Sequence, residues 1–325
     1  MKKVRVGVIG VGHLGQHHAR LYSSLADATL IGVTDSDLVR TGEIAARFGT
    51  NAFPDAAALL HEVDAVSVAV PTSAHHAVVK TALKAGVHVL VEKPITVTRS
   101  EALELIELAG RQNRVLQVGH VERFNPAIQA LRPYIGTPSF IECSRLSPFG
   151  TRALDVDVVR DLMIHDLDIL LSMNLGPIEQ VQAAGVCILS SRIDAANVRI
   201  TFGNGCVANL SASRVSTSPL RELKLYYPDS CIMVDYRTGG VTIQRRNPEG
   251  NGGSIVPIHS PEQVTEEPLK LELQSFVNSI VSHTAPLVSG PDGLAALDLA
   301  DRVTNAIGAF VRQQESSRQS LAVSM

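Results

Sequence analysis

Three segments of this sequence carry side chains whose types and spacing could do chemistry. In the first, residues 10–15 read Gly-Val-Gly-His-Leu-Gly, a G-x-G-x-x-G pattern that follows an apolar run and opens a helical pattern. In that context Gly10 allows a tight turn, Gly12 lets the backbone approach a pyrophosphate, and Gly15 lets the helix pack closely on the strand. The helix N-terminus offers N–H groups and a positive dipole end to phosphates. The pattern predicts a dinucleotide site rather than a glycine-rich turn without a ligand.

An acidic residue follows the second predicted strand. Asp35 stands where a carboxylate would receive the ribose hydroxyls of adenosine. A 2′-phosphate would bring negative charge against that carboxylate, and no Lys or Arg lies between Asp35 and Arg40. We therefore expect NAD as the cofactor, in preference to NADP. The competing interpretation is that Asp35 caps the helix that starts near Ser36, and the two roles are compatible.

The second segment is Glu92-Lys93-Pro94, at the carboxyl end of a strand predicted over 87–91. Open α/β sheets bind their ligands at that edge. A lysine there could donate hydrogen bonds to a substrate hydroxyl and stabilise a developing alkoxide. Pro94 makes the exit from the strand rigid, with either a cis or a trans peptide bond. The alternative is an ordinary surface lysine.

The third segment is a helix predicted over 161–171, in which Asp161, His165 and Asp168 fall on one stripe. Most other positions are apolar, so the stripe either has internal hydrogen-bond partners or lines a polar cavity. Histidine suits proton transfer near neutrality, and Asp161, one turn earlier, could orient His165. The alternative is a structural helix histidine. A metal site is not expected because a third and a fourth ligand are missing.

The secondary structure that positions these segments can also be predicted. The pattern of the first third of the chain predicts a doubly wound α/β domain. Continuously apolar runs alternate with helical patterns, as expected for parallel strands that are covered on both faces. The predicted strands are residues 4–9, 29–33, 65–70, 87–91 and 115–118, and helices follow the first two and cover 74–85 and 100–111. We place a Rossmann-type cofactor domain over residues 1–123.

Beyond residue 123 the pattern predicts an α+β domain over 124–325. A helix begins at Asn125-Pro126 and the 161–171 helix follows. Antiparallel strands are predicted at 181–189, 198–202, 207–213, 223–227, 232–236 and 241–245, a loop at 247–257, and helices at 271–282 and 293–312. The tail after Gln313 is expected to fray, and the last helix could pack back on the first domain.

Composition excludes several classes of function. The 29 basic and 32 acidic residues give a net charge of −3, without a basic cluster for nucleic acid or anionic membrane. No apolar run is long enough to span a bilayer. The cysteines are far apart and predict neither disulfides nor zinc sites; they are Cys143, Cys187, Cys206 and Cys231. We therefore expect a cytoplasmic protein.

Together these motifs resemble the glucose–fructose oxidoreductase and inositol dehydrogenase (Gfo/Idh/MocA) family over nearly the whole chain. Besides the glycine pattern and Asp35, the shared segments are residues 71–75 (Pro-Thr-Ser-Ala-His), 85–89 (Ala-Gly-Val-His-Val), 92–94 and the D-x-x-x-H-x-x-D pattern. The family usually has glycine where this chain has Met163, which leaves the pocket near His165 undefined.

The resemblance implies roles for residues of this chain. Lys93, Asp161 and His165 would form the catalytic group, and Asp161 and His165 would also contact substrate. The cofactor would lie against the glycine loop, including His13 and Leu14, and against Pro71, Thr72, His75, Glu92 and Lys93. The second domain would carry a large open-faced antiparallel sheet through which such proteins form homodimers or homotetramers.

Within the family, residues 118–126 and 161–168 are most similar to members that oxidise the C3 hydroxyl of UDP-N-acetylglucosamine to a ketone, a step toward lipid A with amide-linked chains. Arg123 and Asn125 would then contact the nucleotide sugar. The alternative for these two is a helix N-terminus, with Asn125 as the N-cap, Pro126 in the first turn and Arg123 as a surface charge. Rival functions are a dehydrogenase of another polyol (inositol, a free sugar or a UDP-sugar uronate) and a non-catalytic NAD-binding regulator.

Overall fold

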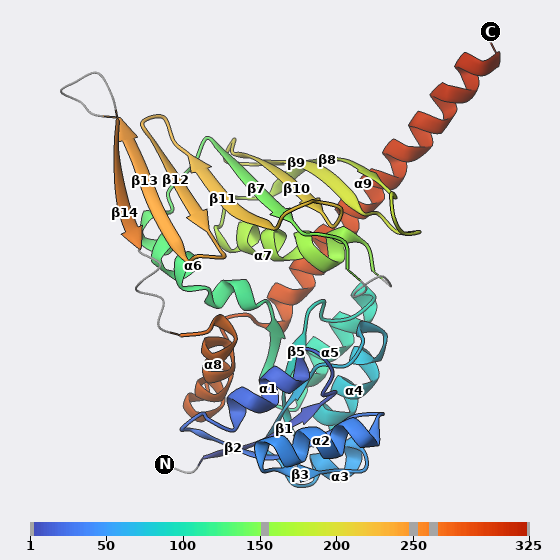
Figure 1. The fold of residues 1–325 in the computed structure, drawn as a ribbon, viewed down its shortest axis with the longest axis vertical. Helices are drawn as coiled ribbons and strands as arrows, with labels where there is room; N and C mark the ends of the chain where they lie inside the picture. The colour runs from blue at the N-terminus through green and yellow to red at the C-terminus, as the bar shows by residue number, and fades with distance from the viewer. Residues whose placement is uncertain (1–2, 151–155, 247–252, 260–265, 324–325) are drawn as a thin grey trace. The chain divides into compact units, whose positions relative to one another are not determined.

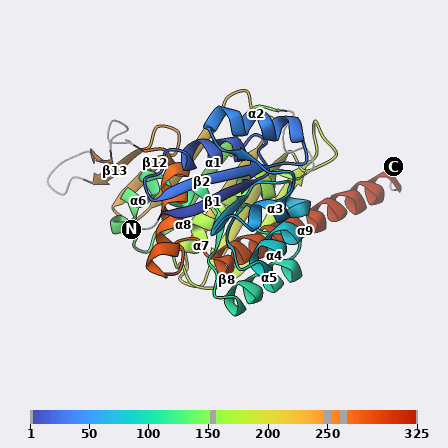
Figure 2. The same cartoon turned by 90° about the horizontal axis from the view of Figure 1, so that it is seen from below.

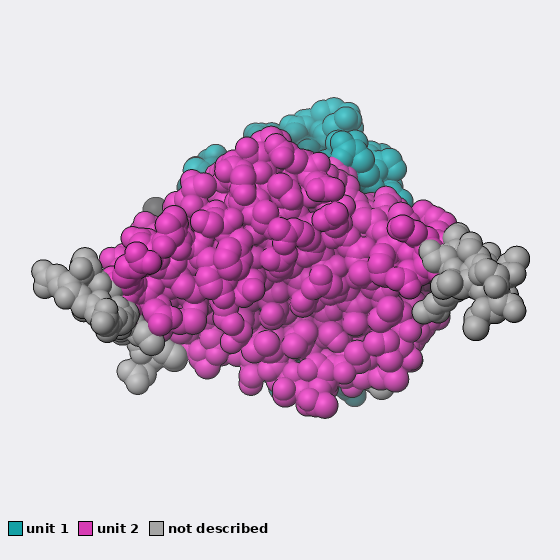
Figure 3. All heavy atoms as spheres, turned by 90° about the horizontal axis from the view of Figure 1, so that it is seen from above, with its two compact units in different colours: residues 1–124, 266–295 teal, residues 125–265, 296–325 magenta. Residues whose placement is uncertain are grey.

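The chain divides into two compact units in the computed structural model, which describes residues 3–150, 156–246, 253–259 and 266–323. The first unit comprises residues 1–124 and 266–295, and the second comprises 125–265 and 296–325 (Figure 3). The division after residue 124 lies one residue from the boundary expected from the sequence. The segment 266–295 belongs to the first unit, although the sequence placed it in the second domain.

A six-stranded parallel sheet forms the centre of the first unit (Figure 1). Its strand order is β3-β2-β1-β4-β5-β6, the order of a Rossmann fold. The strands are β1 (Val4–Ile9), β2 (Ala28–Thr34), β3 (Asn51–Ala52), β4 (Ala65–Val68), β5 (His88–Glu92) and β6 (Leu116–Gly119). All four residues of β4 are buried, because helices cover both faces of the sheet. The predicted doubly wound fold is confirmed.

Helices cover this sheet in two layers, and Figure 2 shows α1 and α2 on one side of β1 and β2. The first layer holds α1 (Gly15–Tyr22), α2 (Leu38–Phe48) and α8 (Pro268–Ser282), and the second holds α3 (Ala56–Leu60), α4 (Thr72–Lys84) and α5 (Arg99–Arg111). Leu273, Phe276 and Val277 of α8 are fully buried in the same core as β1 and α1. This apolar contact explains why α8 belongs to the first unit.

The second unit contains an eight-stranded sheet of order β14-β13-β12-β11-β7-β10-β9-β8 (Figure 1). Among the strands of this sheet that the structure describes, only β7 and β10 pair in parallel, so the predicted mostly antiparallel sheet is confirmed. The strands are β7 (Phe140–Leu146), β8 (Ile178–Val186), β9 (Ala195–Phe202), β10 (Val207–Ser213), β11 (Leu220–Tyr226), β12 (Ser230–Asp235), β13 (Gly240–Arg246) and β14 (Gly253–His259).

One face of this sheet is buried under helices and the other face is accessible. Inward residues of the strands pack with α6 (Pro126–Leu131), α7 (Ile164–Ser172) and the part of α9 (Gly290–Val323) that follows residue 295. Along β10, buried and partly accessible residues alternate, as they do in a sheet with one covered face. Side chains on the accessible face bond to one another, as Asn197 does to Ser211 at 3.0 Å.

The structure corrects several elements predicted from the sequence. Residues 253–257 of the predicted loop form part of β14, while 247–252 lie outside the described residues. The tail does not fray after Gln313, because α9 continues to Val323. No Gly or Pro occurs after Gly308, so the sequence holds no signal to stop the helix. No helix in the described ranges is both long and apolar enough to cross a membrane.

Candidate active site

The glycine loop between β1 and α1 is shaped for a ligand. Gly10 has φ +85°, and a Cβ at Gly15 would lie 1.8 Å from the carbonyl oxygen of Gly10, so both positions require glycine for the fold. A Cβ at Gly12 would meet no protein atom within 4 Å. The N-cap residue of α1, Leu14, makes no side-chain cap hydrogen bond. Gly12 therefore leaves space for another molecule beside a helix N-terminus that can bind an anion.

A hollow of about 680 Å³ extends from this loop along the carboxyl ends of the parallel strands. This size is in the range of small-molecule and cofactor sites. Its lining includes Gly10, Gly12, Leu14, Asp35, Arg40 and Pro71. Several residues that the sequence assigned to a dinucleotide thus lie around one cavity, and the residues present fit such a cofactor.

Asp35 follows β2 and turns its carboxylate toward the glycine loop. One oxygen accepts a hydrogen bond from the amide of Val11 at 2.8 Å, and the other accepts from the amide of Asp37 at 3.0 Å. Burial, the largest influence, would raise the pKa of Asp35, but these amides and the charge of Arg40 hold it below its ordinary value. The carboxylate is therefore ionised at neutral pH.

The N-cap of α2 is Asp37, not Asp35. The Asp37 side chain accepts from the amide of Arg40 at 3.0 Å. The interpretation that Asp35 serves only as the helix cap is therefore wrong. Arg40 reaches back to Asp35, with 3.7 Å between a guanidinium nitrogen and a carboxylate oxygen.

The end of β5 gathers several titratable side chains. Glu92 is the last residue of the strand, Lys93 follows it, and the Lys93–Pro94 peptide bond is cis. His75 of α4 is almost fully buried, with Nδ1 2.9 Å from the carbonyl oxygen of Pro94 and Nε2 3.0 Å from that of Val70. Burial lowers the pKa of His75 despite these contacts, so the ring is neutral at pH 7. His75 thus connects the exits of β4 and β5.

Two buried histidines that the sequence analysis missed also lie in this region. His18 of α1 places Nε2 3.0 Å from the Glu92 carboxylate. His120 follows β6, and burial together with the charge of Lys93 lowers its pKa to about 3. His18 interrupts the apolar stripe of Leu14 and Leu21, and this pattern was the signal that could have identified it.

In the second unit, the D-x-x-x-H-x-x-D segment is built differently from a regular helix. Residues Val159–Met163 form a π-helical turn that continues into α7. The Asp157 side chain, just before this turn, accepts hydrogen bonds from the amides of Val159 and Arg160, both at 2.9 Å. Such wide turns often occur at functional sites because they re-aim side chains.

Only part of the predicted polar stripe is accessible. Asp161 and His165 are half-buried, whereas Asp168 is 1% exposed. The neighbouring Asp166 is also buried and forms two hydrogen bonds with Arg145, at 2.8 and 3.1 Å. Met163 is fully buried in the core of the second unit. The accessible groups on this helix that could do chemistry are therefore Asp161 and His165.

The structure assigns a structural role to Asn125. Its side chain accepts from the amide of Ala127 at 3.1 Å and donates to the carbonyl oxygen of Tyr236 at 3.3 Å, so the predicted N-cap is confirmed. Arg123 is only 8% exposed, and its guanidinium donates to the carbonyl oxygen of Leu287 at 3.4 Å. The interpretation of Arg123 as a surface charge is therefore wrong.

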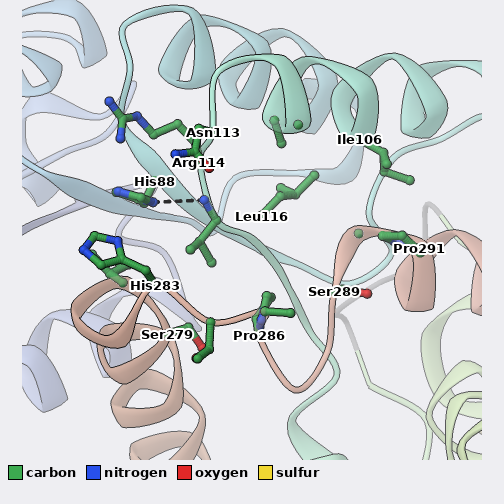
Figure 4. A pocket seen from close by; sticks show the side chains of 17 residues that line it. His88, Ile106, Asn113, Arg114, Leu116, Ser279, His283, Pro286, Ser289 and Pro291 are labelled. Atoms are coloured by element: carbon green, nitrogen blue, oxygen red, sulfur yellow. Dashed lines mark hydrogen bonds between the residues drawn. The ribbon is translucent and has the colours of Figure 1, made fainter.

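A second hollow, of about 460 Å³, lies at the opposite edge of the parallel sheet, where β5 and β6 begin (Figure 4). His88 there accepts a hydrogen bond from the amide of Val115 at 2.9 Å. Burial, and then the charge of Arg114, lowers the pKa of His88 to about 4. This hollow contains none of the residues expected to bind the cofactor or to act in catalysis, so the candidate active site is assigned to the carboxyl edge.

Comparisons with known proteins show to which family the chain belongs. A family profile described as "Oxidoreductase family, NAD-binding Rossmann fold" matches residues 4–120, and a Gfo/Idh/MocA C-terminal domain profile matches residues 132–229. UDP-N-acetylglucosamine 3-dehydrogenase from Acidithiobacillus ferrooxidans is 40% identical over 96% of this chain and 100% of its own length. The chain belongs to the Gfo/Idh/MocA oxidoreductase family.

The fold is also similar to that of solved structures of the family. A crystal form of the Acidithiobacillus enzyme superposes with a TM-score of 0.90 at 40% identity, covering 95% of this chain and 99% of that one. Inositol 2-dehydrogenase from Rhizobium meliloti is 28% identical over 94% of this chain and 97% of its own length. These relatives are dehydrogenases of a nucleotide sugar and of a polyol.

Proposed function

We propose that this Gfo/Idh/MocA oxidoreductase oxidises the C3 hydroxyl of UDP-N-acetylglucosamine to a ketone with NAD⁺, for amino-sugar and lipid A synthesis. The observation that carries the proposal is the 40% identity, over nearly the full length of both chains, to a UDP-N-acetylglucosamine 3-dehydrogenase. The chain also has the catalytic residue types implied by the family resemblance, namely Lys93, Asp161 and His165.

The proposed reaction moves a hydride from the carbinol carbon to the cofactor and a proton to the protein. NAD⁺, when bound, supplies the hydride acceptor at C4 of its nicotinamide. His165 takes the hydroxyl proton, Lys93 stabilises the alkoxide, and Asp161 orients His165 or binds the sugar. The roles of Lys93 and His165 could be exchanged, because a lysine can also act as the base.

The proposed preference for NAD over NADP rests on Asp35. Its carboxylate is ionised and partly buried beside the glycine loop, where it would accept hydrogen bonds from ribose hydroxyls and repel a 2′-phosphate. The first unit is proposed to hold the cofactor, including contacts from His13, Thr72, His75 and Glu92. Arg123 and Asn125 remain candidates for sugar contact; the cap formed by Asn125 favours a supporting role for it.

The second unit is proposed to bind the sugar and to form a homodimer or homotetramer. Support comes from the accessible face of its eight-stranded sheet, where short polar side chains such as Asn197 and Ser211 replace the apolar residues of the covered face. Operation in the cytoplasm is part of the same proposal, because NAD and UDP-sugars are substrates of that compartment.

The proposal is tested by following NADH absorbance with NAD⁺ and a panel of alcohols: UDP-N-acetylglucosamine, UDP-glucuronate, myo-inositol and glucose. A sugar aminotransferase is added to remove ketone. We expect turnover on UDP-N-acetylglucosamine to exceed that on each other alcohol. Faster turnover of inositol would support the polyol alternative, and NADH binding without turnover of any alcohol would support a regulator.

Replacement of the proposed catalytic groups gives a direct prediction. Lys93→Met and His165→Asn should each lower kcat by roughly 100-fold or more, because each removes a group that acts on the transition state. NADH affinity, measured by fluorescence titration, should change far less. Turnover close to the wild-type value in both variants would contradict the assignment.

A further inference from the structure

A buried histidine–carboxylate pair includes Glu92, the residue that precedes Lys93. His18 is 0% exposed, and its Nε2 lies 3.0 Å from an oxygen of Glu92, whose side chain is 12% exposed. His18 belongs to α1, the helix that begins at the glycine loop, and Glu92 ends β5. The pair therefore connects the helix that would bind cofactor phosphates to the strand that leads into Lys93.

Gly119 leaves the space that the Glu92 carboxylate fills. Glu92 and Gly119 are partners in the β5–β6 ladder. A Cβ at Gly119 would lie 3.1 Å from both Cα and Oε2 of Glu92, closer than an ordinary contact. The carboxylate is thus confined between α1 and β6, and its position depends on the donor from His18.

The burial of His18 indicates which of its ring nitrogens carries the hydrogen. Within the described part of the chain, Nδ1 of His18 is buried and has no hydrogen-bond partner. A proton on Nδ1 would bury an unsatisfied donor, so the favoured tautomer carries its hydrogen on Nε2 and donates to Glu92.

Four titratable groups influence the carboxylate: His18 from α1, His75 from α4, Lys93 next in the chain, and His120 after β6. Burial, the largest effect, would raise the pKa of Glu92, but the hydrogen bond from His18 and the positive charge of Lys93 lower it overall. Glu92 is therefore an anion at neutral pH.

We infer that His18 is a positioning residue: through its Nε2–H it holds the Glu92 carboxylate ionised and in place, and Lys93 thereby keeps an anion beside its ammonium group during the alcohol oxidation. This inference rests on the proposed function. It goes beyond that function because the His18 side chain acts through Glu92, the residue before Lys93, and has no role in the proposed reaction itself.

The test compares His18→Leu, which removes the donor, with His18→Gln, which can present an amide N–H near the Nε2 position. His76→Leu is the matched control, because His76 pairs with Glu104 at 2.8 Å on the outer helices α4 and α5. The readout is kcat/KM for UDP-N-acetylglucosamine as a function of pH.

His18→Leu should lower kcat/KM by about 10- to 100-fold, the effect of losing a hydrogen bond to a buried charge. The acidic limb of its pH profile should move to higher pH, because Glu92 then protonates more easily. His18→Gln and His76→Leu should stay within about threefold of the wild type. A wild-type profile for His18→Leu, or equal losses in His18→Leu and His18→Gln, would overturn the inference.

A second measurement does not depend on turnover. Because the pKa of Glu92 is lower in the folded state than in the unfolded state, ionised Glu92 stabilises the folded wild type at pH values above the unfolded-state pKa. This stabilisation is lost as the pH falls through the folded-state pKa. His18→Leu should therefore lower Tm by about 5 °C near pH 8 and by less near pH 3.5, below the ordinary glutamate pKa of 4.5, where Glu92 begins to be protonated. The double variant His18→Leu/Glu92→Gln should show no such pH dependence. An equal Tm deficit at both pH values would contradict the inference.

The two measurements separate the two possible failures. If the wild type makes no NADH from UDP-N-acetylglucosamine, the proposed function fails, and the Tm series still decides whether His18 holds Glu92 ionised. If the wild type turns over and the variants show no pH-dependent change in Tm, the proposed function stands and the role of His18 is contradicted.

Discussion

At the scale of single residues, Asp35 and Arg40 form the pair that would decide between the two cofactors. The Asp35 carboxylate accepts hydrogen bonds from the amides of Val11 and Asp37 and is held ionised. Arg40 lies 3.7 Å from it and lines the same hollow. Removal of the carboxylate would leave a guanidinium where a 2′-phosphate could be received.

We expect Asp35→Ser to raise the ratio of kcat/KM for NADP⁺ to that for NAD⁺ by roughly 10- to 100-fold, since it removes a repulsion between like charges. Adding Arg40→Gln to this variant should reverse most of the gain. Parallel assays with the two cofactors at fixed alcohol measure both effects. An unchanged ratio in Asp35→Ser would show that Asp35 does not face the ribose.

The role of a residue could be predicted from the sequence where the residue belongs to a local motif. It could not be predicted where it depends on a partner far away in the chain. The glycine loop and Asp35 follow from local spacing, and the structure places them around one hollow. The sequence could not show that Asp166 pairs with Arg145, or that Glu92 pairs with His18. These partners are separated by 21 and 74 positions, so only the folded chain brings them together.

At the scale of elements, the glycines in the turn from β1 to α1 have two different roles. One is required for packing within the protein, and the other leaves space for a ligand. A Cβ at Gly15 would collide with the Gly10 carbonyl oxygen, whereas a Cβ at Gly12 would meet no protein atom. One glycine therefore serves packing, and the other leaves space for a bound molecule.

Gly12→Ala should keep Tm within about 2 °C of the wild type and weaken NADH binding roughly 10-fold or more. Gly15→Ala should lose both stability and binding. The control is Gly42→Ala in α2, where a Cβ also meets nothing within 4 Å and alanine is the better helix former. Calorimetry and NADH fluorescence measure the two quantities, and unchanged NADH binding by Gly12→Ala would place the cofactor elsewhere.

Elements with regular periodicity were predicted to within a few residues, and the missed ones have physical reasons. In strand β7, Arg145 interrupts the apolar pattern of the sequence at an inward position, although its side chain is buried with Asp166. Strand β3 has two residues and α3 has five, too short for a periodic signal. Strand β14 was read as part of a loop, since glycine, asparagine and proline surround it.

At the scale of the whole molecule, the chain leaves its first unit after residue 124 and returns to it at residue 266. A domain boundary read along the sequence cannot show such a return. The apolar residues of α8, such as Leu273 and Phe276, show in the sequence that one face of the helix is buried, but only the structure shows which core it joins.

The proposed homo-oligomer depends on the accessible face of the eight-stranded sheet. We expect light scattering to give a dimer or tetramer for the wild type. Ser211→Arg should lower that mass, because a long charged side chain on β10 would prevent close apposition of two sheet faces. Gln112→Arg, an exposed site at the end of α5, is the control. A wild-type mass for Ser211→Arg would exclude this face as the interface.

The most direct measurement uses UDP-N-acetylglucosamine that carries deuterium at C3. The enzyme, NAD⁺ and an aminotransferase that removes the ketone are mixed, and the reduced cofactor is analysed by mass spectrometry and NMR. The account predicts that deuterium appears at C4 of the nicotinamide and that turnover slows relative to the unlabelled sugar. Reduced cofactor without deuterium, or no reduced cofactor, would contradict oxidation at that carbon.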